Sequence, residues 1–489
     1  MTQATRSRLL QDFRHSIIGG GLAGLQAGLI GDGTPVEGPF GIHPLLYADY
    51  VASGRALRQV EGFVAERLLP YYANSHTEAS YCGATMTRTR QEARQIIADH
   101  VGADACHAVV FAGSGATAGI NRLVHLTGAA QAVRDRARVV VLIGPYEHHS
   151  NILPWRECGA EVIEIDEAEN GGPDLDHLRS VCAATHDAEL RIGTFSAGSN
   201  VTGILTDTDA VTSILRENGI VSIWDYAGAG PYVSIDMRTG TAYEKDAVVF
   251  SPHKFIGGPA ASGVLVVRRD IQGNLTPSVT GGGTVRFVSP YGHDYSTDLV
   301  AREEAGTPNV LGDLRAAMAV IVKEAIGQSY MDRRHAELRQ RALDIWAANR
   351  SIELLGKTTK DQLPIFSFRV RNTRDGGFIH QQLFTRMLSD CYGIQARGGC
   401  ACAGPYAHRL LGIGKAQSDR MRAEILAGHE TEKPGWTRLN FSALLTDDKG
   451  DRIIAAVDEL ARNPFPMADQ YRCDPATARF APSPLAEAG

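Results

Sequence analysis

The stretch AVVFSPHKFIGGPAASGVLVVRR, residues 247–269, decides the fold. It holds two apolar, β-branched runs, and between them stand Ser-Pro-His-Lys and a Gly-Gly-Pro turn. The runs predict buried strands, because a strand covered on both faces is apolar at nearly every position. Lys254 closely follows the first strand, where its ammonium group loses water. Desolvation lowers the pKa of a lysine amine, and the neutral amine is the form that makes a Schiff base.

Outward from this stretch, short apolar runs alternate with helix-like stretches between about residues 105 and 270. Seven such runs favour a mostly parallel sheet with helices on both faces. The predicted fold class is α/β, with a large domain built on a seven-stranded, mostly parallel sheet and a smaller C-terminal α+β domain. The predicted strands are His107–Ala112, Val139–Gly144, Glu161–Ile165, Leu190–Ala197, Gly219–Asp225, Ala247–Ser251 and Gly263–Arg269.

Composition divides the chain into four parts. Residues 1–40 are Gly-rich and irregular, which predicts an N-terminal arm. Residues 41–312 form the predicted large domain, in which 271–310 has the composition of a loop. Residues 313–470, with part of the arm, form the predicted small domain, and it begins with long amphipathic helices. Residues 471–489 are a Pro/Ala-rich tail.

Two further segments place functional groups at strand ends. In GIVSIWDYAGAG, residues 219–230, an apolar strand ends at Asp225, at the edge where open α/β sheets bind ligands. In VVFAGSGATAGINRLVHL, residues 109–126, a strand leads through a Gly/Ser/Thr-rich turn into a helix. Such a turn directs backbone N–H groups and a helix N-terminus at one point, which suits a phosphate. Taken alone, each segment also fits an ordinary helix cap or strand–helix turn.

The phosphate turn, Asp225 and Lys254 together are the groups that pyridoxal 5′-phosphate requires. Lys254 would form the Schiff base, Asp225 would keep the pyridine nitrogen protonated, and the turn would hold the phosphate. The segment GPYEHHSNILPW, residues 144–155, adds His148 and His149 after another strand. An aromatic ring is needed there to stack on the pyridine. We therefore predict pyridoxal 5′-phosphate as the cofactor.

Composition and charge exclude several classes of protein. The 489 residues are 44% hydrophobic and 21% charged, which is typical of a folded, soluble enzyme. The net charge of −6 argues against a general nucleic-acid-binding surface, and no apolar run has the roughly 18–20 residues of a membrane span. The polar start MTQATRSRLLQDFRHS lacks the apolar core of a secretory signal. Eight cysteines without regular spacing predict reduced thiols and a cytoplasmic protein.

Six stretches carry a family resemblance that covers roughly residues 41–460. Their order and spacing resemble those of class V aminotransferase-like enzymes that use pyridoxal phosphate, and most of all the branch of group II cysteine desulfurases and selenocysteine lyases. The resemblance implies fold type I, an amino-acid substrate and a homodimer with shared active sites. The stretches are YEHHSNILPW, AGSNVTGILTD, WDYAGA, SPHKFIGGP, EAGTPNVLG and RGGCACA.

The resemblance also implies roles for single residues. Lys254 would be the Schiff-base lysine, Asp225 the partner of the pyridinium nitrogen, and His148 the stacking ring, with His149 as the fallback. Thr307 would reach the phosphate bound by the other subunit. The implied cofactor-binding residues are Gly115, Ala116, Thr117, His148, Asn200, Asp225, Ser251, His253, Lys254 and Thr307.

On the substrate side, the resemblance implies that Asn200 faces the cofactor oxygen or the substrate carboxylate. Arg397 would bind the α-carboxylate through a bidentate pair, which suits a planar guanidinium. Cys402 falls where group II enzymes carry their nucleophilic cysteine. The implied activity is that of a cysteine desulfurase: Cys402 takes up the sulfur of L-cysteine, or a related β-substituted amino acid, as a persulfide, and alanine is released. A sulfur-acceptor protein would be a partner.

The sequence departs from the desulfurase pattern in three places. Gly228 stands where desulfurases usually have a glutamine, Ala116 replaces a phosphate-loop hydroxyl, and Cys400 precedes Cys402 in a Cys-x-Cys loop. The departures leave open a C–S lyase, epimerase or aminotransferase in which Cys402 is not catalytic. A non-catalytic sulfur-transfer or regulatory protein is the alternative from another class. The complete set of Lys254, Asp225 and Arg397 argues against it.

Three other patterns have simpler explanations. GGGLAG, within residues 15–31, matches a dinucleotide-binding fingerprint but lacks both the preceding strand and a later strand-end acid. The pair Cys400 and Cys402 lacks the two further ligands that a zinc site needs, so we predict no metal. His76 is a single loop histidine in a segment similar to dimer-interface segments of the family, and is a weak candidate.

Overall fold

The structure is a computed structural model that describes residues 8–75, 78–357 and 361–483. The chain divides into two compact units. Unit 1 comprises Met1–Ile30, Ser53–Gly198 and Leu205–Ser329, and unit 2 comprises Gly31–Ala52, Ser199–Ile204 and Tyr330–Gly489.

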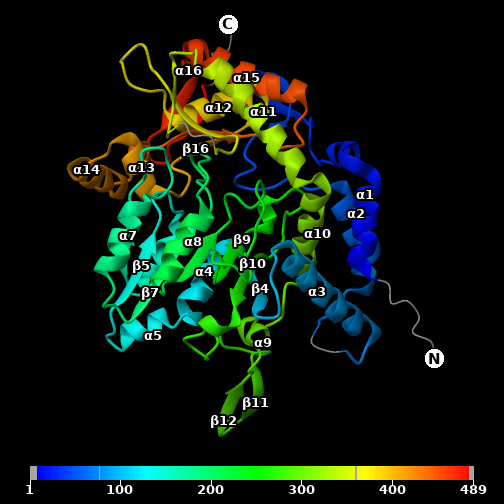
Figure 1. The fold of residues 1–489 in the computed structure, drawn as a ribbon. Coiled ribbons are helices and arrows are strands. Elements are labelled where there is room, and N and C mark those ends of the chain that lie inside the picture. Colours follow the sequence, from blue (N-terminus) through cyan, green and yellow to red (C-terminus); the bar gives the residue numbers. More distant parts are fainter. Residues whose placement is uncertain (1–7, 76–77, 358–360, 484–489) are drawn as a thin grey trace. The chain divides into compact units, whose positions relative to one another are not determined.

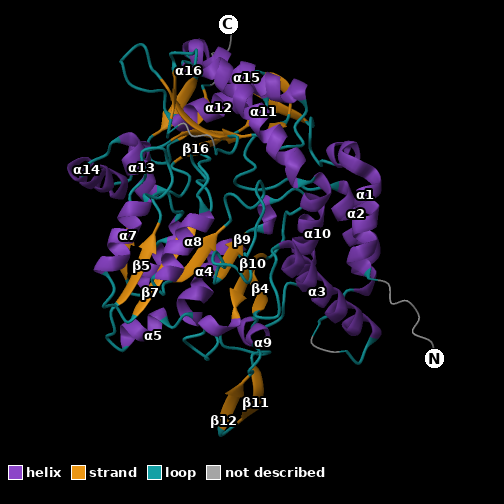
Figure 2. Cartoon of the chain, viewed as in Figure 1, coloured by secondary structure: helices purple, strands orange, loops and turns teal. Residues whose placement is uncertain are grey.

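Unit 1 is built on a seven-stranded sheet with the strand order β4-β10-β9-β8-β7-β5-β6. Figure 2 labels β4, β10, β9, β7 and β5 of this sheet. Strands β5 to β9 pair in parallel, and β10 runs antiparallel to both of its neighbours. The carboxyl ends of all strands except β10 therefore lie along one edge. Every predicted strand is confirmed: β4 (His107–Gly113), β5 (Val139–Ile143), β6 (Glu161–Glu164), β7 (Leu190–Ser196), β8 (Val221–Asp225), β9 (Ala247–Phe250) and β10 (Gly263–Arg268).

Helices cover this sheet because the central strands are apolar on both faces. All residues of β5 and β9 are buried. On one face α4 lies close to β9, where a Cβ atom added at Gly119 would stand 2.8 Å from Val249 Cγ1. The helices of unit 1 are α1 (Leu9–Ala27), α2 (Arg58–Phe63), α3 (Tyr81–His100), α4 (Gly115–Leu126), α5 (Ala129–Arg134), α6 (Leu153–Glu157), α7 (Leu175–Ala184), α8 (Thr208–Glu217), α9 (Leu299–Glu303) and α10 (Val310–Ile326).

Two segments of unit 1 differ from the sequence-based expectation. The Gly-rich N-terminal segment is not irregular, because α1 occupies Leu9–Ala27 and packs beside α10 (Figure 1). Its apolar residues bury one face, while the glycines mask the helical period and only Gly21 leaves helical geometry, with φ +56° and ψ −170°. The predicted loop over 271–310 contains a hairpin of β11 (Val285–Ser289) and β12 (Gly292–Tyr295), and it extends away from the sheet (Figure 1).

Unit 2 mixes strands and helices around its own core. Its main sheet is antiparallel, with the order β13-β14-β17-β16. Trp346 lies at the centre of the core, against the rings of Phe366, Phe368 and Phe441. The strands of the main sheet are β13 (Ile352–Leu354), β14 (Ile365–Val370), β16 (Arg397–Gly399) and β17 (Trp436–Asn440).

The remaining elements of unit 2 surround this sheet. Three two-stranded pairs are β1 (Pro35–Gly38) with β2 (Gly41–Pro44), β3 (Leu46–Tyr47) with β15 (Ile394–Gln395), and β18 (Tyr471–Asp474) with β19 (Arg479–Pro482), so that the predicted tail also forms a hairpin. Its helices are α11 (Gln328–Trp346, from Tyr330 onward), α12 (Gln381–Tyr392), α13 (Gly404–Leu411), α14 (Lys415–Leu426), α15 (Asp447–Arg462) and α16 (Phe465–Ala468). Among the described residues, no helix is both long and apolar enough to cross a membrane.

The packing of α1 generates a first prediction. Phe13 is fully buried, and its ring meets that of Phe63 at 5.2 Å. Phe13→Ala removes this contact and leaves a cavity, so it should lower the free energy of unfolding by about 3–5 kcal/mol. Ile18→Ala on the same helix is the control, because Ile18 is 61% exposed and its loss should change little. Thermal denaturation compares the two, and equal midpoints would contradict the docking of α1.

Candidate functional site

Asp225 and Lys254 lie at the carboxyl edge of the unit 1 sheet, after the adjacent strands β8 and β9. Asp225 is the last residue of β8 and pairs with Val249 of β9. Lys254 ends a short 3₁₀ helix, Pro252–Lys254, that follows β9. Asp225 is 4% exposed, and burial raises the pKa of its carboxyl group. The backbone N–H of Ala227, donating to Asp225 Oδ1 at 2.7 Å, and the charge of Lys254 both lower that pKa.

The glycine turn after β4 meets the segment that carries Lys254. Ser251 is buried, and its Oγ accepts a hydrogen bond of 2.9 Å from the backbone N–H of Ala116. Gly115 has φ +62°, and a Cβ atom there would stand 3.0 Å from Ser251 Oγ and 3.3 Å from His253 Cε1. Glycine is therefore required, because the left-handed backbone and the close approach both disfavour a side chain. The N-terminus of α4 opens here without a side-chain cap.

His253 completes this side of the cluster. Burial first, and then the charge of Lys254, lower the pKa of the His253 imidazole to about 4. The ring is therefore neutral at pH 7 and offers one N–H donor and one acceptor. A neutral donor beside free backbone N–H groups suits the binding of a phosphate without adding a further buried charge.

His148 is held at the same edge by a small hydrogen-bonded network. The backbone N–H of Ser150 donates to His148 Nδ1 at 3.1 Å, and Ser150 Oγ lies 3.1 Å from the same nitrogen. Ser150 Oγ is also 2.7 Å from Thr117 Oγ1 of α4. His149 follows on a short 3₁₀ helix, with its ring centre 6.2 Å from that of His148. The network links the predicted stacking ring to the predicted phosphate turn.

Glu147 is a buried carboxyl group of this cluster that the sequence did not single out. Its two oxygens accept hydrogen bonds from Ser196 N at 2.7 Å, Ser196 Oγ at 2.6 Å and Asn151 Nδ2 at 2.7 Å. Burial, with a smaller effect of the Asp225 charge, raises the pKa of Glu147 to about 7. The sequence could have identified Glu147 by its position, because it follows a buried strand closely, as Asp225 and Lys254 do.

In unit 2, Arg397 of β16 and Arg438 of β17 lie directly opposite each other. Like charges in this position repel each other, and the buried carboxylate of Asp49 compensates for the repulsion. Asp49 Oδ2 accepts from Arg397 Nε and Asp49 Oδ1 from Arg438 Nη2, each at 2.9 Å. Arg438 is buried, and its Nε donor has no hydrogen-bond partner within the described chain. We call these three residues the arginine cluster; its net charge is positive.

Asn200 joins the arginine cluster to the cysteine loop. Its backbone oxygen accepts from Arg438 Nη1 at 3.0 Å, and its Nδ2 donates to the carbonyl oxygen of Ala401 at 2.9 Å. Cys402 is exposed and Cys400 is partly buried, and both are free thiols. Arg438 and Asp49 were missed by sequence reasoning. The signal for Arg438 was a charged residue between the apolar residues of WTRLNF, residues 436–441.

The predicted site residues thus gather in two clusters, each within one unit. The cluster in unit 1, here called the strand-end cluster, holds Gly115, Ala116, Thr117, His148, Asp225, Ser251, His253 and Lys254. Unit 2 holds Asn200, Arg397 and Cys402. Thr307 is exposed on unit 1 after α9. His76 lies outside the described residues. In the described ranges, no group of three or more His, Cys, Asp or Glu side chains is placed to hold a metal ion.

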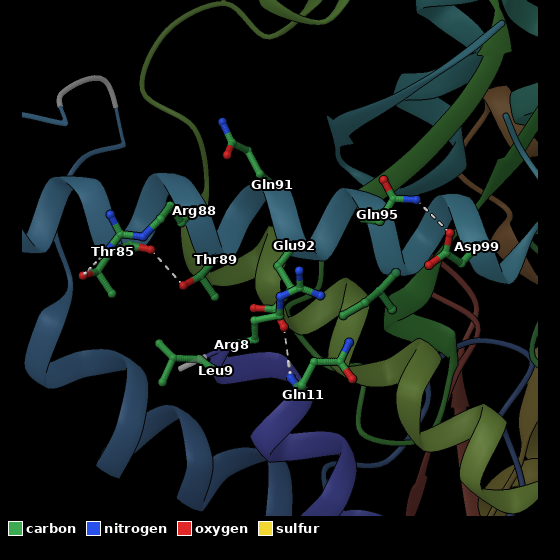
Figure 3. A pocket seen from close by; sticks show the side chains of 11 residues that line it. Arg8, Leu9, Gln11, Thr85, Arg88, Thr89, Gln91, Glu92, Gln95 and Asp99 are labelled. Carbon is green, nitrogen blue, oxygen red and sulfur yellow. Dashed lines mark hydrogen bonds between the residues drawn. The ribbon is translucent and has the colours of Figure 1, made fainter. Parts of the chain in front are cut away.

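A separate pocket of about 500 Å³ lies between the start of α1 and α3 (Figure 3). Glu92 of α3 accepts hydrogen bonds there from the backbone N–H groups of Leu10 and Gln11, and so caps α1. None of the predicted site residues lines it. The pocket therefore belongs to the docking of α1 and not to the strand-end cluster.

Comparison with known proteins identifies the family. The pattern of the family described as aminotransferase class-V matches residues 46–427, which is most of the chain. This chain belongs to the aminotransferase class-V family.

The chain is similar to curated cysteine desulfurases. It is 27% identical over 373 residues to a probable cysteine desulfurase from Staphylococcus epidermidis, covering 76% of this chain and 85% of the relative. It is 28% identical over 378 residues to one from Streptomyces coelicolor, with 75% and 85% covered. The predicted family is thereby confirmed, and with it the assignment to a family of enzymes.

Solved structures confirm the fold. The structure of a cysteine desulfurase from Thermococcus onnurineus superposes with a TM-score of 0.70 at 23% identity, covering 86% of this chain and 95% of that one. A cysteine desulfurase from Escherichia coli gives a TM-score of 0.68 at 22% identity, with 90% and 98% covered. The predicted α/β fold of type I, with a seven-stranded, mostly parallel sheet, is confirmed.

The buried Glu147 generates a second prediction. A carboxyl group whose pKa is raised from 4.5 to about 7 favours the folded state when protonated. Its stabilisation is complete below about pH 4.5 and is lost as the pH rises through 7. The free energy of unfolding should therefore fall by about 2.5 kcal/mol from this group between pH 5 and pH 8. Glu147→Gln should remove that fall, because a neutral amide does not titrate.

Urea denaturation at the two pH values tests this. The Asn151 amide can turn over so that its oxygen accepts from the amide introduced at position 147, and the Thr194 and Ser196 hydroxyls can rotate to accept from the two amide groups. Glu157→Gln, at an exposed position of α6, is the control and should behave as the unchanged protein does. The same pH dependence in Glu147→Gln as in the unchanged protein would contradict the account.

Proposed function

We propose that the protein is a cysteine desulfurase that uses pyridoxal phosphate and transfers the sulfur of L-cysteine, or of a related β-substituted amino acid, to Cys402. The observation that carries the proposal is the exposed Cys402 thiol in a tight turn, five residues after Arg397. The family and the similarity to cysteine desulfurases support it. The proposed function assigns the strand-end cluster to the cofactor and the arginine cluster to the substrate.

The strand-end cluster fits pyridoxal phosphate chemically. Asp225 is a buried carboxylate with a hydrogen bond to only one of its oxygens in the described chain, so the other suits a protonated pyridine nitrogen. The Gly115 turn, with neutral His253 and Ser251, provides backbone and side-chain donors for a phosphate. Lys254 supplies the amine for the covalent bond. When bound, pyridoxal phosphate would supply an electron sink for the α-carbon of the substrate.

Different residues of this cluster would then move the substrate proton and hold the cofactor ring. Lys254 would take the α-proton of the substrate at its Nζ atom once that amine is released, because it follows the strand next to Asp225. Asp225 would keep its negative charge against the ring nitrogen. The Lys254 charge and the Ala227 N–H favour that charged form against the cost of burial. His148, fixed through Ser150, would cover the ring face.

The arginine cluster suits the α-carboxylate of an amino acid. Two guanidinium groups share the single carboxylate of Asp49, so one positive charge is uncompensated. Arg397 is half exposed and paired with Asp49 through Nε, which leaves its terminal nitrogens for a substrate. The unpartnered Nε of buried Arg438 is a further donor within the described chain. Asn200, whose backbone oxygen accepts from Arg438 Nη1, would complete the carboxylate site.

Cys402 would perform the sulfur transfer. Its thiolate would attack the γ-sulfur of the substrate, form a sulfur–sulfur bond and leave a persulfide on Cys402, while the Cβ–S bond breaks. The electron pair of that bond, with a proton, remains on the carbon skeleton, which leaves as alanine. The persulfide sulfur would then pass to an acceptor, and a sulfur-acceptor protein is the partner that this step implies.

We also propose a homodimer in which Thr307 of one chain approaches the cofactor phosphate of the other. Thr307 is exposed, and it follows the projecting hairpin of β11 and β12 in the chain. That hairpin exposes Phe287, Val288 and Tyr291 to solvent, and Tyr291 is 98% exposed. Exposed apolar side chains gathered in this way are typical of a contact surface.

A second candidate is a C–S lyase, epimerase or aminotransferase with the same cofactor. Gly228 favours it, because the residue has no side chain to act on the cofactor ring at the position where desulfurases usually have a glutamine. In that reaction Lys254 would carry all proton transfers and Cys402 would take no part.

Products distinguish the two candidates. Purified protein loaded with pyridoxal phosphate is incubated with L-cysteine and a thiol reductant, and alanine, sulfide, pyruvate and keto acids are measured. We expect alanine and sulfide in equal amounts, and we expect Cys402→Ser to lose alanine formation by at least about 100-fold, because it lacks the nucleophile. Cys473→Ser, at another exposed cysteine, is the control and should keep full turnover. Full turnover by Cys402→Ser, or pyruvate as the main product, would favour the lyase.

A further inference from the structure

Cys400 and Cys402 flank a tight turn in unit 2. The backbone N–H of Ala403 donates to the carbonyl oxygen of Cys400 at 3.1 Å, which closes a four-residue turn. Its two central residues both have left-handed backbone, with φ 54° at Ala401 and φ 56° at Cys402. Positive φ at both central positions is the pattern of a type I′ turn, which glycine and asparagine normally occupy. Here an alanine and a cysteine adopt it.

Such a backbone is unfavourable for residues with a side chain, and it persists only where neighbours impose it. Asn200 does so, since its Nδ2 holds the carbonyl oxygen of Ala401 at 2.9 Å. Asn200 is in turn fixed by the buried Arg438, which donates to its backbone oxygen. Hydrogen bonds through Asn200 therefore connect the turn to the arginine cluster and fix its backbone.

The turn shortens the distance between the two cysteines. In an extended strand, residues two apart have Cα atoms about 6.6 Å apart. A turn closed between its first and fourth residues holds the Cα atoms of those two residues within about 7 Å. The Cα atoms of its first and third residues are then closer together than in an extended strand. The extended separation is near the upper limit of the range of about 4.4–6.8 Å that a disulfide bond allows, and the turn moves the pair towards the usual value of about 5.5–6 Å. Cys402 is open to solvent, and Cys400 stands partly buried beside it.

We propose that Cys400 is a resolving thiol that releases the sulfur of the Cys402 persulfide as sulfide. This inference rests on the proposed desulfurase function. The Cys400 thiolate attacks the γ-sulfur of Cys402, a disulfide between the two forms, and the terminal sulfur leaves as hydrosulfide with the proton that Cys400 gave up. The terminal sulfur is reduced, and the two cysteine sulfurs are oxidised to the disulfide. A dithiol reductant, by thiol–disulfide exchange, returns both cysteines to the free state for the next turnover.

The step changes what the protein delivers. Without a resolving thiol, the persulfide sulfur leaves Cys402 only by transfer to an acceptor protein. With Cys400 as resolving thiol, the chain releases free sulfide and needs only a reductant. The external acceptor is then not required for the first turnover. The left-handed turn keeps the Cys400 thiol close to the Cys402 persulfide.

A single-turnover experiment tests the proposal. Protein loaded with pyridoxal phosphate receives one equivalent of L-cysteine without reductant, and free sulfide, alanine and intact mass are measured after acid quenching. We expect the unchanged protein to form alanine, to release close to one sulfide per chain and to lose two hydrogens, about 2 Da, as its disulfide forms. Cys400→Ser should form alanine but keep the sulfur, with a mass gain of about 32 Da and no sulfide.

Differential alkylation and peptide mapping of the unchanged protein give a second measurement that needs no variant: the expected disulfide joins Cys400 to Cys402. Cys473→Ser is the matched control and should release sulfide as the unchanged protein does. If the unchanged protein keeps the added sulfur as Cys400→Ser does, and no such disulfide is found, the resolving role is wrong while the desulfurase function stands. If no chain forms alanine or gains sulfur, both proposals are wrong.

Discussion

The structure of unit 1 depends on one electrostatic constraint, the placement of a buried carboxylate, Asp225, beside a partly buried amine, Lys254, at the ends of adjacent strands. A carboxylate that is 4% exposed would lose its charge without a compensating group, and the Lys254 charge and one backbone N–H oppose that loss. The parallel sheet makes the pairing possible, because it brings the carboxyl ends of β8 and β9 to one edge. The apolar central strands and their covering helices fix that edge.

The same edge explains which other residues matter. The turn after β4, Glu147 after β5 and Ser196 at the end of β7 all lie along it, and hydrogen bonds connect several of them. Burial disfavours further charge around the central pair, because it lowers the pKa of His253 and raises that of Glu147. Unit 2 has the opposite character, because two arginines share one carboxylate there. A cofactor with an anionic phosphate and a substrate with an anionic carboxylate would each find suitable partners.

Much of this was predictable from the sequence, for a physical reason. Strands buried on both faces are runs of apolar residues, which marked the central strands, and groups that follow such runs, such as Asp225 and Lys254, were found with them. The edge strand β6 was found although it is only partly buried. Glu147 was missed because a buried acid and an exposed acid look alike in a sequence. Asp49 and Arg438 were missed because their pairing joins residues 389 apart in the chain. The helix α1 was missed because its glycines hide the period of its apolar face.

The central claim is that Lys254 is the amine that binds pyridoxal phosphate. Unit 1 offers a competing candidate, because Lys245 is also buried and desolvation lowers its pKa to about 8. Incubation of the purified protein with pyridoxal phosphate, reduction with borohydride and peptide mapping decide between them. We expect an absorption band above about 400 nm before reduction and a single modified residue, Lys254. Modification of Lys245, or of no lysine at all, would contradict it.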